Sequence, residues 1–141
     1  MSDLSMFFAE NVSTEVVEEI VVSERFKDKD GNPAKWKIRA ITESENDKIR
    51  KSCIRQPKNK KKQQMPEFDP NEYRIKLAVN CVVYPDLKNK ELQDSYKVIG
   101  AENLLTAMLF SGEAGDLYEK IYEINGFDKE VDEMADEIKN E

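Results

Sequence analysis

The stretch KWKIRAITESENDKIRKSC, residues 35–53, contains the change of pattern that decides the fold. Its first part alternates, with the apolar residues Trp36, Ile38 and Ala40 separated by charged ones. A period of two is typical of a strand that buries one face and exposes the other. The alternation stops at Thr42, so the strand is predicted to end there.

A helix is predicted to begin where the alternation stops. Thr42 is a suitable N-cap, and Glu45 stands three residues later as the reciprocal partner in a capping box. Ile49 and Cys53 then recur at the spacing of one helical face. The quoted stretch therefore predicts a half-buried strand followed directly by a capped helix.

A second strand is predicted before this stretch. β-Branched residues are dense in VVEEIVVSERF, residues 16–26, where Ile20, Val22 and Phe26 fall on one side at a period of two. The segment DKDGNP, residues 28–33, supplies the Asp, Gly, Asn and Pro residues that favour turns. The two strands are therefore predicted to form a hairpin with one face on the core.

The second half of the chain is predicted to be helical. Asp69 and Pro70 are typical of a helix start, and Pro85 is expected to end that helix. The segment SGEAG, residues 111–115, is predicted to break the next long helical stretch. Gly126 closes the helix that follows, because glycine readily takes the left-handed conformation of a helix end. The helices predicted after the first one span 70–84, 91–96, 101–110 and 117–124.

Together these patterns predict an α+β fold. An N-terminal antiparallel β-hairpin, with room for a third short strand near the N-terminus, packs on a mainly helical C-terminal part of about five helices. We expect one α+β domain over 16–127, with a mobile basic loop at 55–66. A flexible N-terminal arm at 1–15 precedes it, and an acidic amphipathic C-terminal helix or tail at 128–141 follows it.

The arm contains two adjacent phenylalanines, Phe7 and Phe8, which are unusual in a free segment. Two alternatives are open for them: they dock on the body of this protein, or they dock on a partner.

The overall charge limits the classes of partner. The chain has 141 residues, of which 36% are charged, and its formal net charge is −7, which argues against general affinity for nucleic acid or an anionic membrane. No apolar run is long enough to span a membrane, and the first 15 residues carry acids without any basic residue, unlike a secretory signal. Cys53 and Cys81 lie in apolar patterns, so we expect reduced core thiols in a cytoplasmic protein.

The sequence contains no recognisable catalytic or metal-binding motif. Histidine is absent, which removes the His-dependent nucleophile systems and the imidazole metal sites. Asp28, Asp30 and Gly31 resemble a calcium loop only faintly, since Lys37 stands where an EF-hand needs a glutamate. The many carboxylates are interpreted as solvated faces and caps. We expect no enzyme activity, no cofactor and no metal.

The basic run Lys58–Lys62 lies in the predicted loop. Clustered lysines can attract the phosphate backbone of nucleic acid, although no aromatic residue is interleaved here for base stacking. A solvated loop, or one that attracts an acidic protein surface or the acidic tail of this chain, fits the run as well. A small nucleic-acid-binding or regulatory module that uses this loop is therefore the alternative function.

The last segment carries a narrow apolar seam on an acidic background. Phe127, Val131, Met134 and Ile138 recur at helical spacing. A short acidic helix is marginal in water, so this seam needs a surface to pack on. Two alternatives stay open: the seam packs on the body of this protein, or it binds a partner or a second copy.

Three phrases carry a resemblance to a known family. KWKIRAITESENDKIRKSC, EFDPNEYRIKLAVNCVVYPDLKNKELQDSYKVIGAENLLTAML and YEKIYEINGF, taken in that order, resemble the XkdN-like tail assembly chaperones of contractile-tailed phages and phage-like elements of Firmicutes. The resemblance runs from about Glu19 to Phe127. It is most specific around 41–53, 77–92 and 100–109.

The resemblance implies a non-enzymatic function. Members of this family are thought to bind the long helical tape measure protein and keep it soluble while the tail tube assembles around it. The implied location is the cytoplasm of the bacterial host, and the protein is expected to be absent from the mature particle. The tail tube protein and a frameshifted longer form of the chaperone are further implied partners.

A binder of an apolar helix needs exposed apolar side chains. The candidates are Leu105, Leu109 and Phe110 in the apolar stripe, and Tyr84 and Leu87 at the helix break. The other candidates are the seam residues Phe127, Val131, Met134 and Ile138. For the stripe, the competing interpretation is that its side chains form part of the protein's own core.

Overall fold

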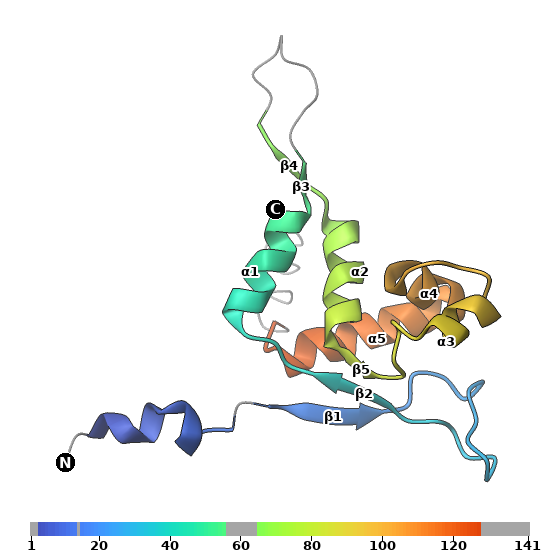
Figure 1. Cartoon of the computed structure of the whole chain (residues 1–141), viewed down its shortest axis with the longest axis horizontal. Helices are drawn as coiled ribbons and strands as arrows, with labels where there is room; N and C mark the ends of the chain where they lie inside the picture. Colours follow the sequence, from blue (N-terminus) through green and yellow to red (C-terminus); the bar gives the residue numbers. More distant parts are fainter. Residues whose placement is uncertain (1–2, 14, 56–64, 128–141) are drawn as a thin grey trace, which may run out of the picture.

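A computed structural model describes residues 3–13, 15–55 and 65–127 of the chain. A small antiparallel sheet forms one layer, and the helices cover one of its faces (Figure 1). The predicted α+β class is confirmed. Lys58–Lys62 and the seam residues Val131, Met134 and Ile138 lie outside the described residues, so the hypotheses about them stay predictions.

The sheet is built around the predicted hairpin. Its strands are β1 (Val17–Ile20), β2 (Trp36–Arg39) and β5 (Val82–Tyr84), in the order β1-β2-β5. In the antiparallel pairing of β1 with β2, Glu18 lies opposite Ile38, and Ile20 lies opposite Trp36. Trp36 and Ile38 are buried while Lys37 is exposed, which confirms the alternation expected from the sequence.

The third strand comes from a part of the chain that was predicted to be helical. Helix α2 (Pro70–Cys81) ends earlier than expected, and β5 pairs with β2 instead of continuing that helix to Pro85. Val82 and Val83 are β-branched, and the residue before a proline is disfavoured in the helical region. Both effects favour a strand at 82–84.

The two predicted helix starts have the expected caps. At the start of α1 (Glu43–Ser52), the Thr42 hydroxyl accepts a bond from the Glu45 N–H at 3.2 Å, and the Glu45 carboxylate accepts the Thr42 N–H at 3.3 Å. At the start of α2, the Asp69 carboxylate accepts the N–H groups of Asn71 and Glu72 at 3.0 and 3.1 Å. These bonds satisfy donors that a helix N-terminus otherwise leaves free.

The predicted break at SGEAG is wrong. Helix α4 (Ala101–Met108) ends before Leu109, and α5 (Ser111–Ile124) already begins at the serine of that segment. The Glu113 carboxylate accepts the Phe110 N–H at 2.8 Å, so the new helix is capped from its third residue. The remaining elements are α3 (Lys90–Ser95), the 3-10 helices η1 (Asp3–Phe7) and η2 (Ala9–Asn11), and a two-stranded ribbon of β3 (Ile54–Arg55) and β4 (Glu67–Phe68).

One apolar core joins the sheet to the helices. Ile38 and Leu104 are fully buried, and Leu77, Leu117 and Ile121 are each only 1% exposed. The two cysteines are free and buried, as predicted. Burial raises the pKa of the Cys81 thiol to about 11, so this group behaves as a neutral core side chain.

We expect Ile38→Ala to lower the free energy of unfolding by about 2–5 kcal/mol, because it opens a cavity in a close-packed core. Val17→Ala is the matched control, since Val17 lies on β1 with its side chain about half exposed. That control should change stability by about 0.5 kcal/mol or less. Urea denaturation measures both, and equal effects would contradict the assignment of the two faces.

Candidate partner-binding surface

Three of the predicted partner contacts lie in the core. Leu87, Leu105 and Leu109 are each 6% exposed or less. Leu105 and Leu109 belong to the apolar stripe, for which a core position was the competing interpretation. In this fold they stabilise the body, and a partner could touch them only if the helices separated.

Three other predicted contacts lie at the surface. Tyr84 on β5 is 57% exposed, and Phe110 between α4 and α5 is 65% exposed. Phe127 is partly buried and packs against Tyr122 of α5, with 6.3 Å between ring centroids. These three predicted contacts therefore lie in different places: Tyr84 on the sheet, Phe110 at the junction of α4 and α5, and Phe127 at the end of the helical layer.

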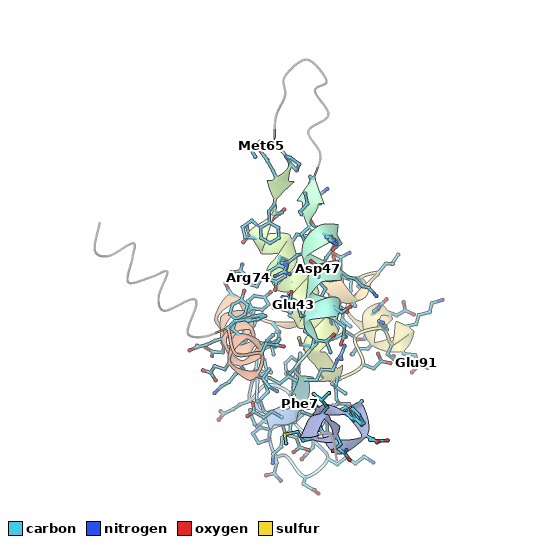
Figure 2. All side chains as sticks on the ribbon, turned by 90° about the vertical axis from the view of Figure 1, so that its left-hand side faces the viewer. Phe7, Glu43, Asp47, Met65, Arg74 and Glu91 are labelled. Atoms are coloured by element: carbon cyan, nitrogen blue, oxygen red, sulfur yellow. The ribbon has the colours of Figure 1, made fainter. Side chains whose placement is uncertain are left out.

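Phe127 and Tyr122 belong to a group of aromatic side chains contributed by β4, α2 and α5. Phe68 of β4 packs on Tyr73 of α2 at 5.6 Å between centroids, and the Arg74 guanidinium lies 4.9 Å from the centre of the Tyr118 ring. Figure 2 shows Arg74 beside α5. We call this group the aromatic surface; its members are Phe68, Tyr73, Tyr118, Tyr122 and Phe127.

The aromatic surface is half-buried and carries polar tips. Burial raises the pKa of Tyr73, Tyr118 and Tyr122, so their hydroxyls stay neutral. The Tyr73 hydroxyl donates to the amide oxygen of buried Asn46 on α1, which holds that ring in place. Rigid tyrosine rings with an arginine beside them match the composition of protein interfaces.

Sequence reasoning missed most of the aromatic surface. The signal that could have found it is the spacing of Tyr118 and Tyr122, which stand four residues apart on one face of α5. Phe68 and Tyr73 come from another element, and their place beside α5 depends on the fold.

Phe110 belongs to a second cluster, which is organised by Arg25. The Arg25 guanidinium lies 4.0 Å from the centre of the Phe110 ring and donates to the Met108 carbonyl at 2.9 Å. Its Nε also donates to the Glu113 carboxylate at 3.0 Å. Arg25 therefore ties the segment between β1 and β2 to the junction of α4 and α5.

This contact perturbs the carboxylate strongly. The Arg25 guanidinium, followed by the Ser23 hydroxyl and the Phe110 N–H, lowers the pKa of Glu113 to about 2. The pKa is lowered because all three donors stabilise the charged form of the carboxylate. The cluster is thus a structural anchor beneath an exposed aromatic ring.

The described residues show neither a metal cluster nor a membrane span. No group of three or more Asp, Glu or Cys side chains among them could hold a metal ion. None of the helices in the described ranges is long and apolar enough to cross a membrane.

Comparison with known proteins identifies the class. The profile of the family described as phage XkdN-like tail assembly chaperone protein matches residues 4–139. Protein YqbN of Bacillus subtilis (strain 168) is 32% identical over 140 residues, which cover 98% of this chain and 93% of YqbN. Protein XkdN of the phage-like element PBSX in the same organism is 27% identical, covering 98% of this chain and 94% of XkdN.

A solved structure agrees with these sequence matches. The crystal structure of YqbN covers 90% of this chain and 98% of its own, with a TM-score of 0.74 and 31% identity. The chain is thus a phage tail assembly chaperone by class. It belongs to the XkdN-like tail assembly chaperone family. The family indicates a non-enzymatic role with protein partners in tail assembly.

The Glu113 contact makes stability depend on pH. Because the pKa of Glu113 is lowered in the folded protein, its contribution is present above about pH 4.5 and is lost as the pH falls toward 2. We expect Glu113→Gln to lower the Tm at neutral pH and to match the unsubstituted protein near pH 2. Glu119→Gln removes a charge from the same helix and serves as the control. A difference in Tm for Glu113→Gln that stays constant with pH would contradict this role.

Proposed function

We propose that this chain is a non-enzymatic chaperone that binds the tape measure protein and keeps it soluble while the tail tube assembles. The observation that carries the proposal is the match of the tail assembly chaperone family to residues 4–139. A tape measure protein is long, helical and apolar, so it would self-associate without a cover. The proposed place of action is the cytoplasm of the host, with the protein absent from the finished particle.

The aromatic surface is the proposed contact for a helix of the tape measure protein. An amphipathic helix binds by laying its apolar face on a complementary apolar surface, and tyrosine is enriched among the side chains that dominate such interfaces. The Tyr118 ring already packs against the Arg74 guanidinium and the Tyr122 ring against Phe127, so binding would order few further side chains. Phe110, exposed at the other end of α5, extends the contact.

The predicted seam continues from the aromatic surface in sequence. Phe127 is the last described residue and packs on Tyr122. Val131, Met134 and Ile138 follow it in the chain. We propose that these side chains contact the same partner, which would lengthen the apolar contact beyond α5.

Co-expression with the tape measure protein of the same genetic element tests the function. We expect the two proteins to co-purify and the soluble fraction of the tape measure protein to rise when this chain is present. A long coiled-coil protein with no role in tail assembly, expressed in the same way, shows whether capture is specific. A tape measure protein that is soluble alone, with this chain eluting separately, would overturn the proposal.

Substitutions in the aromatic surface and at Phe110 test where the partner binds. We expect Tyr118→Ala combined with Phe110→Ala to weaken capture by about tenfold or more, because truncated interface aromatics often dominate affinity. Ile99→Ala is the control, since Ile99 is 87% exposed before α4 and lies outside the proposed contact. Met134→Asp tests the seam in the same way, and we expect it to weaken capture of the tape measure protein. Undiminished capture by a folded variant of either kind would remove that region from the contact.

A further inference from the structure

The N-terminal arm exposes several large apolar side chains. Their exposed fractions range from 45% at Val12 to 73% at Phe7, and the arm extends from the start of β1 away from the sheet and helices (Figure 1). The exposed apolar residues of the arm are Leu4, Met6, Phe7, Phe8 and Val12. A surface of this kind in so short a segment marks a contact site.

The arm nevertheless has a defined local shape. The Phe8 N–H donates to the Ser5 carbonyl at 3.1 Å, the Asn11 N–H donates to the Phe8 carbonyl at 2.9 Å, and the Asn11 side chain donates to the Ser5 carbonyl at 2.7 Å. These bonds close the turns of η1 and η2. Such short 3-10 helices gain little stability alone, so the arm needs a surface that covers its phenylalanines.

The outer face of the sheet has complementary apolar side chains. We define this outer face by Val17, Val21, Val83 and Tyr84, which are 45–57% exposed. Tyr84 pairs with Lys37, which alternates with buried Trp36 and Ile38, so this face points away from the core. An open hollow beside Tyr84 is lined by Val21, Asp28, Asn32, Pro33, Ala34 and Lys35.

The charges of the two surfaces are also complementary. Residues 1–15 contain Asp3, Glu10 and Glu15 and no lysine or arginine. On the outer face, Lys35 and Lys37 make no ion pair with any described residue, while Glu19 is the one acid opposite Lys37.

Two other charged side chains near the outer face already have partners within the chain. Asp28 accepts the backbone N–H groups of Asp30 and Asn32, at 2.9 and 3.0 Å. Arg39 pairs with Glu45 of α1 at 2.9 Å. The outer face therefore offers apolar contact with a basic bias, and the arm offers apolar contact with an acidic one.

We propose that the arm of one copy packs on the outer sheet face of a second copy. A two-fold pair would use each surface twice, with both arms exchanged. The arm leads away from its own sheet, and the backbone at Phe8 and Val12 is extended. To cover its own face, the arm would have to fold back toward the sheet from the start of β1. A second copy could contact the arm in its observed position, without any change in the direction of the arm.

A cross-link between two single variants tests the proposal. Phe8→Cys chains are mixed with size-tagged Tyr84→Cys chains and oxidised with copper phenanthroline; Cys53 and Cys81 are buried and should not react. We expect a mixed disulfide dimer on a non-reducing gel. Ile99→Cys, an exposed position away from the proposed contact, is the matched control and should give little product with Phe8→Cys.

Solution mass supplies the second measurement. We expect light scattering to show twice the monomer mass for the unsubstituted chain, and Phe8→Asp to raise the dissociation constant by about tenfold or more. At concentrations low enough to dissociate both proteins, the two monomers should have the same Tm. A monomer at every concentration would overturn the proposal. An intramolecular disulfide in the Phe8→Cys, Tyr84→Cys double variant would overturn it in favour of the chain's own sheet. A dimer whose dissociation constant is unchanged by Phe8→Asp would show that the contact lies elsewhere, and it would also overturn the proposal.

Discussion

The burial of Trp36 and Ile38 beneath the helices joins the two layers of this fold. Both side chains come from β2, the central strand, which pairs with β1 on one side and β5 on the other. They belong to the same core cluster as Leu77 of α2 and Leu104 of α4. Because side chains alternate along a strand, fixing these two inside also turns Lys37 outward. A shift of one residue would exchange the core face and the outer face.

Local signals predicted most of this architecture. The hairpin followed from alternation around Ile38, and the starts of α1 and α2 followed from Thr42 and Asp69, whose side chains accept the backbone N–H groups they were expected to accept. These features depend on residues close together in the chain. The cue for α2 lay within four residues, 69–72, so no knowledge of the tertiary fold was needed.

The errors occurred where distant residues decide the structure. Val82 continues the apolar face of α2 in sequence, but pairing with β2 makes residues 82–84 a strand. At 111–115 the glycines favour a break, whereas Glu113 caps the new helix and is held by Arg25, 88 residues away along the chain. The aromatic surface could not be predicted for the same reason. Phe68 and Tyr73 lie in one stretch of sequence and Tyr118, Tyr122 and Phe127 in another, and the two groups meet only after α2 and α5 have packed.

The two layers present different surfaces, and this separation has a consequence for a chaperone. The outer face lies on the sheet, whereas the aromatic surface lies on the helical layer, so occupation of one need not block the other. A pair joined through the arms would hold two aromatic surfaces on one particle. Against a long helical partner, the second contact forms at the effective concentration set by the first, so weak contacts at each surface can combine into stable coverage. Under the proposed function, each contact is then released singly as the tail tube assembles around the tape measure protein.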